Sequence, residues 1–153
     1  MMRPKRQGNL MSNGDREAFT RGLIADLREH GGKVASGPMA GRPLMILTTT
    51  GAKTGKPRTV IVTFTRDGDA YVVAGSKSGA PTDPFWFNNL VANPTVRAEA
   101  EGKAFDARAT VARGADRDQL WVRHVAERPE FAGYPEKSGR VIPMARITPI
   151  PGS

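Results

Sequence analysis

The chain has 153 residues, enough for one domain with a core of its own, and its 39% hydrophobic and 25% charged residues are typical of a globular protein. It has no cysteine, which excludes disulfides, thiolate catalysis and cysteine-bearing zinc sites, and two histidines are too few for a histidine-only metal cage, so we expect no metal. The net charge of +8, from 23 Lys and Arg against 15 Asp and Glu, favours an anionic partner such as nucleic acid, a membrane surface or a phosphorylated ligand, with a basic surface kept for solubility as the alternative.

Residues 1–37 are expected to form an N-terminal extension with one amphipathic helix at 15–30. Gly31-Gly32 ends this helix, and its apolar residues recur at helical spacing: Ala18, Phe19, Leu23, Ile24 and Leu27. We expect the helix to pack on its own domain, with peripheral membrane contact as the alternative. No apolar run approaches the roughly 20 residues that cross a bilayer, and the N-terminus lacks the apolar stretch of a secretory signal. The expected location is the cytoplasm, with membrane association left open.

Residues 38–153 are expected to form the main domain, with about six mostly antiparallel strands at 43–50, 59–65, 70–76, 95–100, 104–112 and 141–148. The turn at Asp67-Gly68 predicts a hairpin between the second and third strands. Asp83 is expected to be the N-cap, and Pro84 the first residue, of a helix at 84–93. A further helix is expected at 115–128, followed by a loop. These elements predict a mainly β, α+β fold: a small closed or split β-barrel.

The loop "GAKTGKPR", residues 51–58, looks like a phosphate loop but does not follow the Walker pattern. Its two glycines are one residue too close, Pro57 stands where Ser or Thr would bind Mg²⁺, and a strand follows where a helix should begin. It still suits an anion, because glycines let the backbone approach a ligand and Lys53 and Arg58 can converge on it. The alternative is a basic loop in solvent.

A second unusual segment, "AGSKSGAPTDPFWFNNL" (residues 74–90), joins a strand end to a helix with three consecutive aromatic residues. Ser76 and Lys77 supply a hydroxyl and a cation at that strand end. Three successive helical residues span roughly 200° of the helix surface, so at least one of the aromatic residues must leave the core for a pocket or an interface. The alternative for Trp86 is an ordinary core position, packed against Leu90 four residues later. A core position is less expected for Phe85.

The segments "TTTGAKTGKPR" (48–58), "DGDAYVVAGSKSGAPTDPFWFNNLVANPTV" (67–96) and "GRVIPMARI" (139–147) together resemble the deazaflavin (F420)-dependent nitroreductase family, which includes F420H2-dependent quinone reductase-like proteins. The resemblance covers roughly residues 38–150. It implies an FMN-binding-protein-like split barrel that binds coenzyme F420, a flavin-like ring with carbon at the hydride-donating position, carried on a phosphate and an oligoglutamate tail. A cationic loop without nucleotide-binding features suits such a tail.

The resemblance also implies roles for individual residues. Lys53 and Arg58, with the backbone of Thr54 and Gly55, correspond to the receptor for the phosphate and first glutamates. The implied cofactor-binding residues are Lys53, Thr54, Gly55, Arg58, Ala74, Ser76, Lys77, Phe85, Trp86 and Asn89. Tyr134 and Ser76 are the candidates for orienting or protonating the acceptor, with a purely structural loop anchor as the alternative for Tyr134. This chain departs from the family where several tyrosines are common: Phe131 stands at one such position, which puts the acceptor preference in doubt.

Three functions follow from these observations. The favoured one is an oxidoreductase that transfers a hydride from reduced F420 to a planar acceptor such as a quinone, an enone or a nitroaromatic compound. The alternative is a non-catalytic carrier of F420 or FMN on the same barrel. The third, a binder of nucleic acid or of anionic membranes, is disfavoured because the distinctive cations lie at loop hinges, and no nucleic-acid partner is expected. A homodimer is left open.

Overall fold

The structure, a computed structural model, describes residues 13–34, 37, 39–76 and 83–152. Within these residues, seven strands form one antiparallel sheet in the order β2-β1-β5-β6-β7-β4-β3. The strands are β1 (Leu44–Thr50), β2 (Pro57–Thr63), β3 (Thr65–Asp67), β4 (Ala70–Ala74), β5 (Thr95–Ala100), β6 (Lys103–Val111) and β7 (Met144–Pro149).

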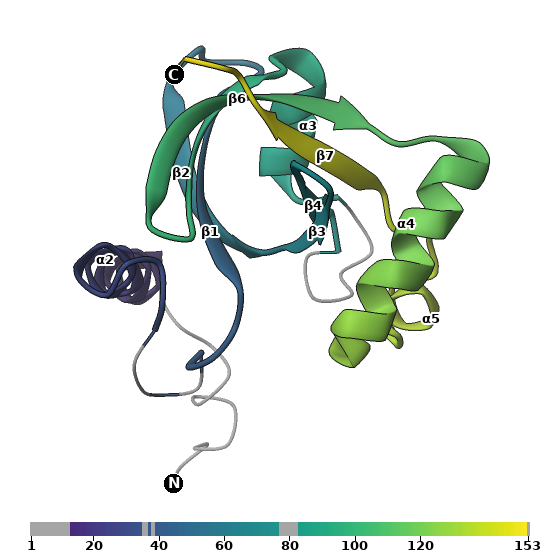
Figure 1. Ribbon diagram of the computed structural model, residues 1–153. Helices are drawn as coiled ribbons and strands as arrows, with labels where there is room; N and C mark the ends of the chain where they lie inside the picture. Colours follow the sequence, from purple (N-terminus) through teal and green to yellow (C-terminus); the bar gives the residue numbers. More distant parts are fainter. Residues whose placement is uncertain (1–12, 35–36, 38, 77–82, 153) are drawn as a thin grey trace, which may run out of the picture.

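The sheet curls because its two edge strands are consecutive in the chain. β2 ends at Thr63, β3 begins at Thr65, and the intervening Phe64 donates its N–H to the carbonyl of Pro43 at 3.0 Å. The outer edges of the sheet are thereby brought together, and Figure 1 shows the resulting ring of strands. The split barrel expected from the sequence is confirmed, with seven strands and not six. The extra strand arises because the run expected as one strand, 59–65, divides at Phe64.

The first predicted hairpin is only partly correct. The turn is in place, because Asp67 pairs with Ala70 across Gly68, whose φ of +60° suits glycine. Of the predicted strand at 59–65, however, only Thr65 belongs to this hairpin, as the first residue of β3. β2 pairs instead with β1, from Leu44 opposite Thr63 to Thr50 opposite Pro57. The segment 51–56 is therefore the turn of a β1–β2 hairpin.

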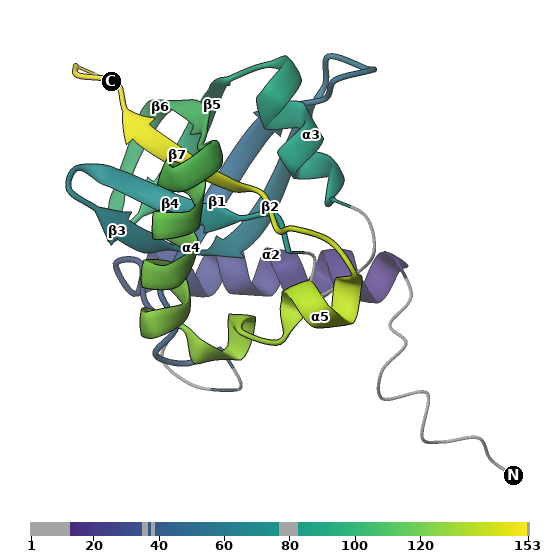
Figure 2. The same cartoon turned by 90° about the vertical axis from the view of Figure 1, so that its right-hand side faces the viewer.

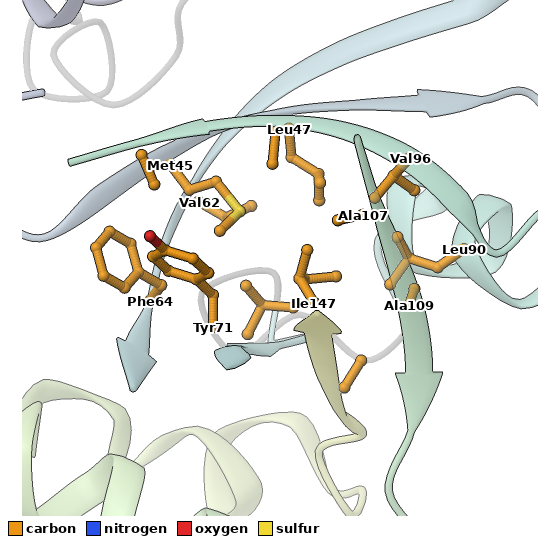
Figure 3. Packing of buried hydrophobic residues seen from close by; sticks show 14 of the residues in the cluster. Met45, Leu47, Val62, Phe64, Tyr71, Leu90, Val96, Ala107, Ala109 and Ile147 are labelled. Carbon is orange, nitrogen blue, oxygen red and sulfur yellow. The ribbon is translucent and has the colours of Figure 1, made fainter. Parts of the chain in front are cut away.

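The main core lies inside the half-barrel and is built from alternate residues of the strands. Figure 3 shows Met45, Leu47, Val62, Tyr71 and Ile147 pointing into this space. Met45, Leu47 and Ile147 are fully buried. The ring of Tyr71 packs edge-on against Phe64, and its hydroxyl donates to Glu101 at 2.8 Å, so the polar tip of this core residue is satisfied.

Helix α2 (Asn13–Glu29) packs on the outer face of β1 and β2, away from the barrel interior (Figure 1). Leu27 is buried with Leu44 and Ile46, and Arg28 donates two hydrogen bonds to Glu99 at 2.9 and 2.7 Å. The helix ends against the β5–β6 turn, where a Cβ on Gly32 would lie 2.6 Å from the backbone nitrogen of Gly102. This close backbone contact accepts no side chain. The expected packing of the helix on its own domain is thus observed.

The other helices of the described residues are α3 (Phe85–Ala92), α4 (Gly114–Glu127), the short 3₁₀ helix η2 (Pro129–Phe131) and α5 (Tyr134–Ser138). Figure 2 shows α4 and α5 together on one side of the barrel. The expectation of a loop after α4 was wrong, because Pro135 suits the start of α5 and Gly139, with φ of +72°, suits its end. Arg146 of β7 fixes α4 through two hydrogen bonds to Asp116, at 2.6 and 2.8 Å.

Candidate functional site

The turn between β1 and β2 has a defined internal geometry. Gly51 donates its N–H to the carbonyl of Lys56 at 2.8 Å, and Gly55 donates its N–H to the carbonyl of Gly51 at 2.9 Å. The Thr54 hydroxyl accepts the N–H of Lys56 at 3.2 Å and lies where a Cβ on Gly51 would be. The Gly55 N–H is therefore used inside the turn, whereas the N–H groups of Lys53 and Thr54 find no acceptor among the described residues. Two such adjacent donors suit an anion.

The side chain of Asn89, on α3, anchors this turn through hydrogen bonds. Its side-chain oxygen accepts the N–H of Ala52 at 2.9 Å, and its side-chain nitrogen donates to the Thr49 hydroxyl at 3.1 Å. One turn further along α3, Asn93 donates to the carbonyl of Thr50 at 3.3 Å. Asn89 is buried, so the structure places it beneath the turn as its anchor. Contact between Asn89 and a cofactor stays a prediction.

The cations of the turn have no counter-charge in the described part of the chain. Lys53, Lys56 and Arg58 are exposed and form no ion pair with any described carboxylate, and the sequence from 48 to 66 contains no Asp or Glu. Arg58, on β2, pairs with Thr49 of β1. It lies on the same face of β2 as Val62, whose side chain is part of the barrel core. Many other arginines of the protein are paired, as Arg28 is with Glu99. Unpaired cations at one turn are the charge pattern of an anion site.

The second predicted segment leaves the barrel at the end of β4. Ala74 and Ser76 are buried, and Gly75 donates its N–H to the carbonyl of Pro143 at 2.9 Å. A Cβ on Gly75 would lie 2.9 Å from the ring of Phe87, so the first turn of α3 presses directly on this strand end. Helix α3 thus contacts both the cationic turn, through Asn89, and the strand end at Gly75, through Phe87. Lys77 lies outside the described residues.

The three aromatic residues of α3 divide as helical geometry requires. Phe87 and Trp86 are buried in the barrel core, with their ring centroids 5.7 Å apart, and Leu90 is buried in the same cluster. Phe85 is 60% exposed at the first position of the helix, two residues before Phe87, whose ring lies against Gly75. Phe85 is therefore the residue of the three that is free to line a pocket, while the structure assigns Trp86 to the core.

Tyr134 begins α5 and is half-buried. Its ring packs edge-on against Phe131 with centroids 5.2 Å apart, and Phe131 packs in turn against His124 at 4.6 Å. His124 is fully buried, and its Nδ1 lies 2.8 Å from the hydroxyl of Thr65. Burial, reinforced by the positive charge of Arg128, lowers the pKa of His124 to about 4. His124 is thus a neutral residue that supports the aromatic layer under Tyr134, whose hydroxyl bonds to no described residue.

Two residues of the site were missed or misread at the sequence level. Asp83 is not the N-cap of α3, because Pro84 occupies that position without a side-chain cap bond. Its carboxylate pairs instead with Arg140, which also donates to the carbonyls of Gly75 and Ser76 at 2.9 and 3.1 Å. Arg140 lies in the quoted segment 139–147, but nothing local in the sequence shows that it reaches residues 57 and 65 positions away.

Comparison with known proteins agrees with this geometry. A family model described as F420H(2)-dependent quinone reductase matches residues 19–149, most of α2 included. F420H(2)-dependent quinone reductases from two strains of Mycobacterium tuberculosis are 38% identical over 109 residues, covering 69% of this chain and 73% of theirs.

Two solved structures are similar in fold and sequence. The F420-H2 dependent reductase FDR-A gives a TM-score of 0.63 at 36% identity, over 69% of this chain and 94% of that chain. A protein described as a domain-swapped dimer gives 0.65 at 32% identity, over 86% and 98%. The expected split barrel, of the type found in FMN-binding proteins, is confirmed. With a family match over most of its length and relatives at this level of identity, the chain belongs to the F420H(2)-dependent quinone reductase family.

Proposed function

We propose that this protein transfers a hydride from reduced coenzyme F420 to a planar acceptor of the quinone class. The observation that carries the proposal is the cationic turn at 51–58. Its side chains Lys53, Lys56 and Arg58 have no ion-pair partner among the described residues, and the N–H groups of Lys53 and Thr54 find no acceptor there either. An enzyme that reduces quinones with F420 needs such a receptor for a phosphate and an acidic tail.

The residues present fit this coenzyme in charge, and helix α3 connects the two parts of the proposed site. The acidic tail would be held by Lys53, Arg58 and the N–H groups of Lys53 and Thr54, on a turn without carboxylates. Helix α3 leads from this turn to the Gly75–Ser76 strand end, and eight helical residues span about 12 Å. At that end the exposed ring of Phe85 offers a wall for an aromatic ring system.

When bound, the coenzyme supplies the hydride, so the protein's task is to bind, orient and manage protons. We propose Tyr134 and Ser76 as the residues that orient or protonate the acceptor. Tyr134 is suited to this because its ring is fixed by Phe131 while its hydroxyl has no partner among the described residues. Ser76 is suited because the carbonyl of the same residue is held by Arg140.

The test combines binding with turnover. Purified protein is titrated with F420 and separately with FMN, and then reduced F420 is mixed with a soluble benzoquinone while the return of the oxidised coenzyme's absorbance is followed. We expect tighter binding of F420 than of FMN, and oxidation that depends on both protein and quinone. Binding of F420 without turnover on any quinone would instead indicate a carrier, and preferential binding of FMN would overturn the proposal.

The finer acceptor range follows from the same assay. Phe131 stands where a tyrosine is common in the family, and as a phenylalanine it has no hydroxyl to offer an acceptor. Its ring is buried against His124. We propose that quinones are reduced faster than nitroaromatic compounds, because fewer donors are available for a nitro group. Equal rates with matched quinone and nitroaromatic acceptors would contradict this.

Membrane contact through α2 is a separate proposal. No helix among the described residues is long and apolar enough to cross a membrane. Leu27 faces the barrel, but Phe19 on the same helix is 47% exposed and could insert into a lipid surface that also holds quinones. Flotation of the full chain and of Phe19→Ser with anionic liposomes tests this, and equal flotation of the two proteins would refute it.

A further inference from the structure

Arg140 makes contacts that the binding of a cofactor tail does not explain. One terminal nitrogen of its guanidinium donates to the carbonyls of Gly75 and Ser76 at 2.9 and 3.1 Å, and the other pairs with the carboxylate of Asp83. The side chain is only 16% exposed. A buried guanidinium that satisfies three acceptors holds them at fixed separations, because its donors form a planar fork.

The acceptors belong to two different elements of the candidate site. Gly75 and Ser76 follow the end of β4, and Asp83 comes directly before Pro84, the N-cap of α3. One side chain therefore ties the strand end that carries Ser76 to the helix that begins with Phe85. The packing at this point leaves little room, since a Cβ on Gly75 would be 2.9 Å from Phe87 and 3.0 Å from Pro143.

The backbone of Arg140 joins a third element. Helix α5 runs from Tyr134 to Ser138, and its C-cap Gly139 has a left-handed conformation that turns the chain toward Arg140. The N–H of Arg140 donates to the hydroxyl of Ser138 at 3.2 Å, and that hydroxyl in turn lies 3.3 Å from the carbonyl of Pro135. The position of α5 is thereby linked to the same guanidinium that holds Ser76 and Asp83.

We propose that Arg140 is a positioning residue that sets the relative placement of Ser76, the first turn of α3 and α5, and so the shape of the site that receives the coenzyme ring. The proposal rests on the proposed function, because only then do these three elements surround a ring and an acceptor. Arg140 acts through the groups it holds. A lysine can place one charge near Asp83 but cannot reproduce the planar fork.

Arg117 provides a matched control. Its side chain is 14% exposed, and its guanidinium donates two hydrogen bonds to the carbonyl of Ile142, at 3.0 and 2.7 Å, close in sequence to Arg140. It contacts neither Ser76 nor Asp83 in the described part of the chain. Replacing either arginine removes hydrogen bonds from a mostly buried side chain, but only Arg140→Met and Arg140→Lys should disturb the ring site.

The first measurement is made without coenzyme, by residue-resolved amide hydrogen exchange. The N–H groups of Gly75 and Phe87 are bonded to the carbonyls of Pro143 and Pro84, so their exchange reports opening of this corner. We expect both Arg140 variants to speed exchange at these amides by about 10- to 100-fold, the scale of lost charge-assisted hydrogen bonds, with little change in β5 and β6. Arg117 holds Ile142, which precedes the Pro143 acceptor of Gly75, so in Arg117→Met the Phe87 amide is the reporter and should exchange as in the unaltered protein.

The second measurement is the dissociation constant for F420 by fluorescence titration. We expect about a tenfold or greater rise in Arg140→Met and in Arg140→Lys, no change in Arg117→Met, and an effect of Asp83→Asn that does not add to that of Arg140→Met. Unchanged exchange and affinity in the Arg140 variants would overturn the inference, as would faster exchange spread evenly over the barrel. If the unaltered protein fails to bind F420, the proposed function fails, while the exchange measurement still decides whether Arg140 holds this corner.

Discussion

The side-chain oxygen of Asn89, in the middle of α3, accepts a hydrogen bond from the backbone N–H of Ala52 at 2.9 Å, and this bond joins the helix to the cationic turn. The amide nitrogen of the same side chain donates to Thr49, so both ends of a buried amide are satisfied. The turn is thus fixed to the barrel by a buried side chain, while its cations are exposed to solvent. Asn89 thereby anchors the exposed turn at 51–56 to the buried side of α3.

Replacing Asn89 by Ala is expected to lower the free energy of unfolding by about 1–3 kcal/mol, because the Ala52 N–H loses its acceptor in a partly buried position. The affinity for F420 should fall with it, since the turn is no longer held. Urea unfolding and F420 titration measure the two effects. Asn88→Ala is the control: Asn88 is exposed on the same helix, and its loss should change stability by less than about 0.5 kcal/mol. Equal effects of the two substitutions would contradict the anchoring role.

Lys53→Ala and Arg58→Ala are each expected to weaken F420 binding by about 1–3 kcal/mol, the scale of charge-assisted hydrogen bonds. Stability should stay nearly constant, because neither side chain has an ion-pair partner among the described residues. Fluorescence titration at low salt measures the affinity. Lys103→Ala removes an exposed cation at the β5–β6 turn, at the opposite end of the barrel, and should leave binding unchanged. A similar loss in all three variants would mean that net charge, and not this turn, attracts the coenzyme.

Tyr134→Phe is expected to reduce turnover with quinones by about tenfold or more, because a positioned hydroxyl that orients or protonates the acceptor is lost. F420 affinity should change less than about twofold, since the ring contact with Phe131 remains. The protein has one other tyrosine, Tyr71, whose hydroxyl is bonded to Glu101 at the far end of the barrel. Tyr71→Phe should cost stability without a selective loss of turnover. Unchanged kinetics in Tyr134→Phe would leave it the role of a loop anchor.

The stability of the protein should fall in mild acid because of His124. Its pKa is lowered to about 4 by burial, whereas in the unfolded chain it titrates near 6.5, so protons bind the unfolded state preferentially between these values. The contribution of His124 is therefore complete above about pH 6.5 and is lost as the pH falls toward 4, by up to roughly 3 kcal/mol.

Urea unfolding at several pH values between 7 and 4.5 measures this slope. His124→Gln should flatten it, even if the variant is less stable throughout. His30 is exposed and its pKa is raised, first by a hydrogen bond to the backbone of Asp26, so it contributes with the opposite sign. His30→Gln should therefore leave the slope at least as steep as in the unaltered protein. Persistence of the full slope in His124→Gln would assign it to other groups.

Local sequence signals predicted most elements, whereas long-range pairing was beyond them. The Asp67-Gly68 turn and the glycine stop after α2 are local features, and both were predicted correctly. The division of one apolar run at Phe64 was not, because it depends on which neighbour each half pairs with, and Pro43 supplies the acceptor that diverts the chain. Helix α5 was missed although Pro135 and Gly139 mark its ends, because five residues give too short a periodic pattern.

The candidate site was anticipated in its segments but not in its connections. The cationic turn and the strand end at Ser76 were both identified, yet the contact of α3 with each could not be read from spacing alone. Asp83 before Pro84 is a common helix-start pattern, and it was misread because Arg140 offers that carboxylate a stronger, charged partner. The residues around Asp83 in the sequence give no sign of a partner 57 positions away.

The order of strands has a consequence for how the protein is made. β7 is the last strand of the described part of the chain, but it lies between β6 and β4 and pairs with both. During synthesis, the edge of β4 that pairs with β7 therefore stays unpaired while more than 60 further residues are added. It is covered only when Met144–Pro149 has been made and pairs with both β4 and β6. A stalled or truncated nascent chain would expose that edge to its neighbours, which makes late translation the aggregation-prone interval for this fold.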